Sequence, residues 1–119
     1  MPHLYVEYSA NLSGLPEQQM LSELNAAVCS HQTIADEFDV KSRIAPVQQF
    51  VIGTAPAQRG FIHARLQLMS GRTPEVKKEL SERIAQVLRR LTPQPQGMLV
   101  QVSVDIGDME RSCYHKSQL

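Results

Sequence analysis

Alternating apolar and polar residues predict the β-strands of this chain. At its start, apolar residues fall on one face of the predicted strand and mostly polar residues on the other. The two sets are Leu4, Val6 and Tyr8 against His3, Tyr5 and Glu7. The same period of two, typical of a half-buried strand, recurs over 61–69 and 98–106, and a less regular apolar stretch covers 41–52. Four strands are therefore predicted, and Pro46 puts the second at a sheet edge or a bulge.

Apolar residues at spacings of three and four predict two helices. The stripes are Met20, Leu21, Leu24, Ala27 and Val28 in the first helix and Val76, Leu80, Ile84, Val87 and Leu91 in the second. Pro16 opens the first helix, while Thr73 as N-cap and Pro74 at the first helical position open the second. Residues 34–39 are irregular and acidic, which predicts a solvated loop with Phe38 turned inward.

The order strand, proline-started helix, strand occurs twice. Pro16-Glu17 and Pro74-Glu75 are offset by 58 residues, and the strand segments that begin at His3 and His63 by 60. Each half, about 2–55 and 60–107, is predicted to be a β-α-β unit with parallel strands. The fold class is therefore α/β: one four-stranded mixed sheet with two helices on one face, in a single domain over 1–119 with a tail over 108–119. We expect the other face to be apolar and covered by a further copy of the chain, in a homo-oligomer.

Composition and charge narrow the classes of partner. The 119 residues include 12 basic and 12 acidic side chains, and this balance argues against a general nucleic-acid surface. No apolar run of about 18 residues predicts a membrane span, and the start lacks the pattern of a signal peptide. Cys29 and Cys113 are far apart and form no CxxC pattern, so they are expected to be free thiols in a reducing cytoplasm.

Pro2 and three basic residues are the candidates for chemistry. If Met1 is removed, the nitrogen of Pro2 changes from an amide to a secondary amine that titrates near neutral pH. Lys41, Arg43 and Arg72 lie at predicted strand or loop junctions, and Arg72 precedes a helix N-terminus, where a carboxylate binds well. The alternative reading for each basic residue is a solvated surface charge, and for Pro2 a merely terminal position.

Other motifs point to no further chemistry. His3 and His63 occupy matching positions of the repeat but lack zinc-binding spacing, so structural roles are expected and no metal is predicted. Residues 70–73 lack the pattern of a nucleotide-binding loop, and no Gly-x-Ser-x-Gly marks a serine hydrolase. Tyr8 is expected in the core because it shares the apolar face of its strand.

The stretch from Pro2 to Asn11 resembles the start of 5-carboxymethyl-2-hydroxymuconate isomerases, a family of the tautomerase superfamily. The similarity continues through 41–43, 61–64 and the Gly71-Arg72 turn, and more loosely through 108–116. The resemblance implies a homotrimer with a tautomerase fold and a proton transfer on an unsaturated 2-hydroxy or 2-keto acid from the breakdown of aromatic compounds. It also implies that no metal or organic cofactor takes part.

The resemblance assigns a role to each candidate residue. It makes Pro2 the catalytic base after removal of Met1, and it makes Arg72 and Arg43 ligands of the substrate carboxylates. Lys41 stands where relatives carry the first arginine of an Arg-x-Arg stretch. Lysine lacks the planar fork with which arginine binds a carboxylate. Two other functions stay open on the sequence alone: a non-catalytic domain that binds a small molecule, and a protein-interaction module of the same fold.

Overall fold

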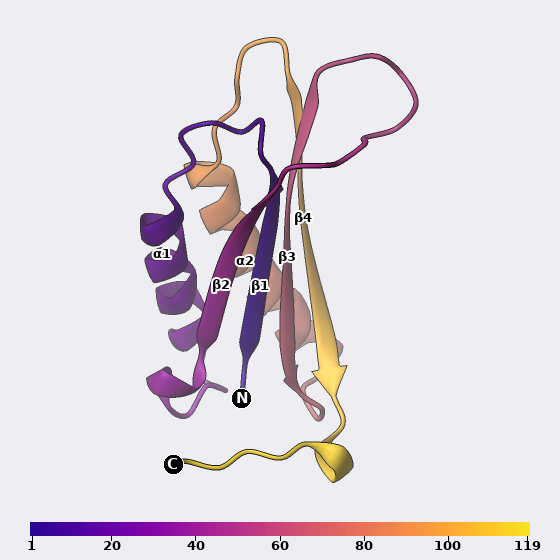
Figure 1. The fold of residues 1–119 in the computed structure, drawn as a ribbon. Helices are drawn as coiled ribbons and strands as arrows, with labels where there is room; N and C mark the ends of the chain where they lie inside the picture. Colours follow the sequence, from indigo (N-terminus) through magenta and orange to yellow (C-terminus); the bar gives the residue numbers. More distant parts are fainter.

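The structure is a computed structural model that describes all of residues 1–119. Its elements are β1 (His3–Ser9), α1 (Glu17–Cys29), the 3-10 helix η1 (Glu37–Asp39), β2 (Lys41–Val47), β3 (Arg59–Met69), α2 (Pro74–Leu91), β4 (Leu99–Met109) and the 3-10 helix η2 (Arg111–Cys113). Figure 1 shows one sheet with both helices beside it and the C-terminal tail crossing below the end where β1 begins. Neither α1 nor α2 has the length and apolar character that a membrane crossing needs.

The sheet has the order β2-β1-β3-β4. β1 pairs with β2 and β3 pairs with β4 in parallel, whereas the two central strands, β1 and β3, are antiparallel. This is the predicted mixed sheet of two β-α-β units. β2 is an edge strand, as Pro46 indicated, because proline cannot donate a hydrogen bond to a second neighbour.

The core lies between the sheet and the two helices. It contains 17 buried apolar residues. The fully buried members include Leu4, Ile62, Ala64 and Leu66 from the strands, Met20, Leu24 and Val28 from α1, and Leu80, Ile84 and Leu88 from α2. The predicted start of α2 is confirmed, because the Thr73 hydroxyl accepts a hydrogen bond from the backbone N–H of Val76 at 3.2 Å. The apolar periods of the sequence thus define the core.

The sheet face opposite the helices is polar. It carries Tyr5 and Glu7 from β1 and His63, Arg65 and Gln67 from β3, which the strand register puts opposite one another. The expectation of an apolar second face is therefore wrong. Because the strands alternate, most apolar side chains point to the helices and leave mainly polar ones on this open face, with Phe61 and Leu99 as exceptions. The homo-oligomer stays a prediction, now for a polar surface.

Four local expectations are corrected. β2 ends at Val47 and not at 52, because its partner β1 ends at Ser9 and a strand needs a neighbour. Phe38 is 56% exposed, so its inward position is wrong. The predicted solvated loop contains a short 3-10 helix, and Asp39 at its end is buried although Phe38 is not. β4 continues to Met109, beyond its predicted end at 106, because it pairs with β3 over its whole length.

Candidate active site

Pro2 lies buried at the start of β1, at one end of the sheet. The backbone oxygen of Pro2 accepts a hydrogen bond from the N–H of Lys41 at 3.1 Å. β1 is a central strand with a neighbour on either side. The position of the N-terminus is therefore fixed by the sheet.

The surroundings of the N-terminus disfavour a charged amine. The amine belongs to Met1 here, and its partial burial is the largest cause that lowers its pKa below the ordinary value. The carboxylate of Asp39 opposes this effect. The cations of Arg72, Lys116 and Lys41 lower the pKa further. Two of the predicted site residues, Arg72 and Lys41, thus act on the same amine.

An ion pair between Asp39 and Lys116 lies at this end of the sheet. The Lys116 ammonium lies 2.6 Å from Oδ1 of Asp39, whose side chain is 11% exposed. This hydrogen bond is the main cause that holds the pKa of Asp39 below its ordinary value. The Lys41 ammonium donates to the backbone oxygen of Asp39 at 3.0 Å. The pair fastens the C-terminal tail beneath the start of β1 (Figure 1).

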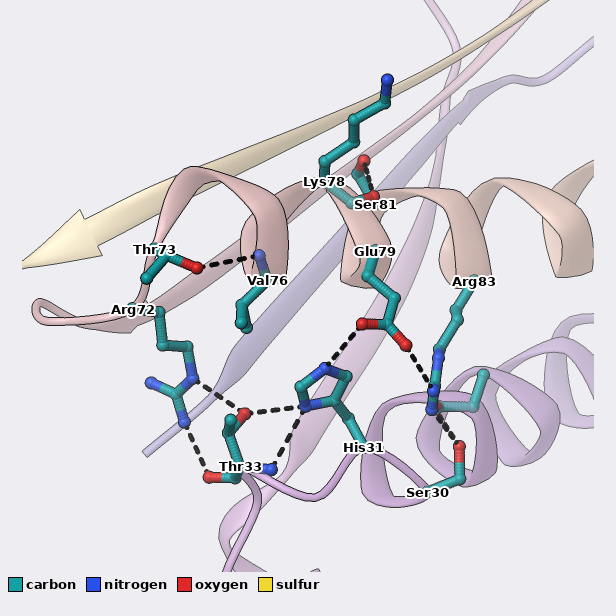
Figure 2. A network of polar contacts seen from close by, with 11 residues as sticks. Ser30, His31, Thr33, Arg72, Thr73, Val76, Lys78, Glu79, Ser81 and Arg83 are labelled. Carbon is teal, nitrogen blue, oxygen red and sulfur yellow. Dashed lines mark hydrogen bonds and ion pairs between the residues drawn. The ribbon is translucent and has the colours of Figure 1, made fainter.

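Arg72 leaves the turn after β3 and reaches the segment that follows α1 (Figure 2). Its Nε donates to the Thr33 hydroxyl at 3.1 Å and its Nη2 to the Thr33 backbone oxygen at 3.0 Å. Its Nη1 donates to the Met69 backbone oxygen at 3.3 Å. Burial lowers the pKa of Arg72 from its ordinary value, and nearby Arg111 lowers it further. The guanidinium is thus fixed and partly desolvated.

Arg43 lies against an aromatic group at the edge of this region. Its guanidinium carbon is 4.3 Å from the ring centre of Tyr5, and its terminal nitrogens are 3.4 Å from Nδ1 of His3. Because a guanidinium can only donate, Nδ1 accepts, which leaves the Nε2–H of His3 to donate to the Tyr114 hydroxyl at 3.3 Å. Burial and then Arg43 lower the pKa of His3. Lys41 and Arg72 thus lie close enough to the N-terminal amine to affect its charge, and Arg43 contacts His3, the residue after Pro2.

Sequence reasoning missed four residues of this region: Asp39, Lys116, Tyr114 and Thr33. Asp39 belongs to an acidic run that was interpreted as solvated, and Lys116 contacts it from 77 positions away. Thr33 lies after the end of α1, in a segment whose sequence shows no apolar periodicity. The loose family resemblance over 108–116 was the single signal that included Tyr114 and Lys116.

Two surface cavities lie away from Pro2. One, of about 440 Å³, lies between the end of α2 and β4, with Arg89 and Val100 in its lining. The other, of about 340 Å³, is on the open face and is lined in part by Tyr5 and His63. The linings of these two cavities do not include Pro2, Lys41 or Arg72. We identify the candidate site by the charged residues around the N-terminal amine and not by a cavity.

Similar solved structures share the fold of this chain. A 5-carboxymethyl-2-hydroxymuconate isomerase from Deinococcus radiodurans R1 is 24% identical, with a TM-score of 0.84 over 99% of this chain and 90% of that chain. A 5-carboxymethyl-2-hydroxymuconate delta-isomerase is 22% identical, with a TM-score of 0.80 over 100% and 88%. A fused wild-type 4-OT protein, solved as an asymmetric trimer, is 18% identical, with a TM-score of 0.72 over 98% and 94%.

The family follows from a match along nearly the whole sequence. A comparison with curated proteins gave no match. The model of a protein family described as 5-carboxymethyl-2-hydroxymuconate isomerase matches residues 2–118, a range that begins at Pro2 and ends beyond Lys116. The chain therefore belongs to the 5-carboxymethyl-2-hydroxymuconate isomerase family, whose members are isomerases of the tautomerase superfamily.

Proposed function

We propose that this chain, after removal of Met1, isomerises an unsaturated 2-hydroxy or 2-keto polycarboxylic acid such as 5-carboxymethyl-2-hydroxymuconate, with Pro2 as the base. One observation carries the proposal: Pro2 lies buried beside Lys41 at the start of β1. There burial and three cations, against the opposing Asp39, lower the pKa of the adjoining Met1 amine. A neutral amine near pH 7 can accept a proton, and a general base works best when its pKa is close to the working pH. Removal of Met1 would put the Pro2 amine in this cluster.

The proposed reaction transfers one proton and keeps the composition of the substrate. The neutral nitrogen of Pro2 takes the proton of the enol hydroxyl, and the electrons of the O–H bond form the carbonyl. The double bonds of the substrate shift, and one of the substrate's carbon atoms takes the proton back from the protonated Pro2. The scheme needs no metal and no organic cofactor.

The basic residues supply the binding of the carboxylates. Arg72 presents a fixed guanidinium close enough to act on the amine, which suits one carboxylate of the substrate. Lys41 offers a point charge beside Pro2, and Arg43 is assigned to a second carboxylate at the edge of the site. A substrate with several carboxylates matches this distribution of cations.

The pH profile of the isomerase tests the role of the amine. With 5-carboxymethyl-2-hydroxymuconate as substrate, kcat/KM should rise as Pro2 loses its proton, so the profile has an acid limb at the pKa of Pro2. In Lys116→Ala the amine loses a cation that lowers its pKa, so the acid limb should move to higher pH. In Asp39→Asn it loses an anion that raises its pKa, so the limb should move to lower pH.

The matched control is Lys78→Ala, which removes an exposed lysine from the outer side of α2 and should leave the acid limb in place. Shifts of the same sign in Lys116→Ala and Asp39→Asn would contradict the assignment of the limb to this amine. A processed chain that binds the substrate without converting it would instead be a small-molecule-binding member of the fold.

We also propose that the chain works as a homotrimer in the cytoplasm. Cys29 and Cys113 are free thiols, which suits a reducing compartment. The open face and the exposed edge of β4 are surfaces that a further copy would cover. The similarity to a protein solved as a trimer supports this number of subunits.

The mass in solution tests the trimer. Native mass spectrometry should give three times the mass of the 13.3 kDa chain. Arg65 lies on the open face, with its Nε 4.0 Å from Oδ2 of Asp105. Arg65→Glu reverses a charge on the surface that a further copy would cover, so it should shift the population toward monomer. The control Lys78→Glu reverses a charge on α2, away from the open face, and should leave the oligomeric state unchanged. A wild-type monomer at micromolar concentration would contradict the trimer.

A further inference from the structure

A buried histidine connects the two helices near Arg72. His31 follows the end of α1 and is 3% exposed. Its Nδ1 lies 2.9 Å from the Thr33 hydroxyl, and its Nε2 lies 3.3 Å from Oε2 of Glu79 on α2. Glu79 in turn accepts a hydrogen bond from Arg83 at 2.8 Å. Figure 2 shows these contacts as one continuous chain that ends at Arg72.

Two groups that can only donate, the Arg72 guanidinium and the Thr33 backbone N–H, set the directions of the hydrogen bonds among Arg72, Thr33 and His31. A guanidinium has no acceptor, so the Thr33 hydroxyl accepts from Nε of Arg72 and has its own proton free to donate to Nδ1 of His31. The backbone N–H of Thr33 also donates to Nδ1, at 3.2 Å. The imidazole is therefore the Nε2–H form, and its N–H donates to Glu79. Hydrogen bonds from Arg83 and then from His31 hold the pKa of Glu79 below its ordinary value, which keeps it an acceptor at neutral pH.

The network leaves Arg72 with a defined set of free donors. Three of its five N–H groups are bonded: Nε and one on Nη2 to Thr33, and one on Nη1 to the Met69 backbone. One N–H on each terminal nitrogen remains. Two such N–H groups are what a bidentate contact with a carboxylate uses, and they must be held in place for it to form. A long, flexible side chain would otherwise lose rotamer freedom when substrate binds.

We propose that Thr33, His31 and Glu79 are positioning residues that hold Arg72 ready for a substrate carboxylate. The assignment rests on the proposed role of Arg72 in substrate binding. None of the three touches the substrate; they act through the guanidinium alone. Their loss should therefore raise KM and leave kcat nearly unchanged, because the contact is the same in the ground state and the transition state.

Thr33→Val tests the proposal most directly, since it removes the hydroxyl and keeps the shape. We expect KM for 5-carboxymethyl-2-hydroxymuconate to rise about tenfold, the loss of one charge-assisted hydrogen bond. Thr33→Ser keeps the hydroxyl and should restore the wild-type KM. In an Arg72→Ala background, Thr33→Val should add nothing, because the residue it positions is gone.

Two substitutions of His31 separate the halves of the network. In His31→Asn the side-chain oxygen can take the place of Nδ1 and accept from Thr33, but the bond to Glu79 is lost, so KM should rise by less than in Thr33→Val. In His31→Gln the amide reaches toward Glu79 and loses the acceptor for Thr33, so KM should rise as in Thr33→Val. A purely structural role would lower kcat through a smaller folded fraction in both variants and leave KM alone.

A direct measurement decides the inference even if the chain proves to have no isomerase activity. In 15N NMR spectra, the Nε–H of Arg72 should exchange slowly with water in the wild type and in Thr33→Ser, and fast in Thr33→Val. Equal exchange in all three overturns the network. Unchanged KM in Thr33→Val alongside a raised KM in Arg72→Ala overturns positioning alone, whereas an unaffected Arg72→Ala overturns the proposed binding role of Arg72.

Discussion

A chain in which the nitrogen of Pro2 stays an amide is expected to lose about 10²–10⁴-fold in kcat/KM, the range for loss of a general base. Insertion of one alanine before Pro2 makes such a chain, because an amide nitrogen cannot accept a proton at neutral pH. Pro2→Ala should fall between this variant and the wild type. It keeps an amine but loses the ring that fixes its direction. Turnover of 5-carboxymethyl-2-hydroxymuconate gives the rate, and intact-mass measurement verifies that Met1 is absent.

Pro56→Ala is the matched control for this experiment. Pro56 lies in the exposed loop between β2 and β3, so its replacement should leave kcat/KM unchanged. An insertion variant that works as fast as the processed wild type would exclude Pro2 as the base. The isomerase activity itself would survive that result, with the base to be sought elsewhere.

Arg72→Ala is expected to lower kcat/KM by about 10²-fold or more, mainly through KM, which matches the loss of a desolvated, hydrogen-bonded partner of a carboxylate. Arg72→Lys should recover little of this loss, because an ammonium keeps the charge but lacks the fork. Initial rates over a range of substrate concentrations separate KM from kcat.

Arg89→Ala controls for the removal of an arginine. Arg89 is exposed in the last turn of α2, so the variant should keep wild-type kinetics. Because Arg72 also bonds Thr33 and Met69, thermal unfolding should be followed in parallel. Wild-type KM in a folded Arg72→Ala protein would show that this guanidinium does not bind the substrate.

Local signals in the sequence predict most of the fold. The alternation of β1 and the stripe of α2 each have a period that matches one secondary structure, and Thr73 caps α2 as its type and place indicate. The ends of the strands were less accurate because they depend on partners. β2 stops at Val47 where β1 stops, although the apolar character of the sequence continues to Ile52.

The candidate site was predicted only in part, because its charges are paired over long distances in the chain. Pro2, Lys41 and Arg72 could be named from their types and the family resemblance. The burial of Asp39 depends on Lys116, and no local pattern around either residue records that contact. The polar open face was derivable, since each strand already showed which of its two sides was apolar. The error came from treating apolar content as if it were shared by both sides.

The crossing of the C-terminal tail below the start of β1 affects how the protein should be produced. A purification tag at the N-terminus would turn the nitrogen of Pro2 into an amide. Its linker would also have to run out of the structure from Pro2, which is buried. A tag at the C-terminus would extend a segment that Lys116 fastens to Asp39 close to the same amine. Recombinant protein without an added terminal segment, or with a tag removed to leave Pro2 first, is therefore the form whose activity is informative.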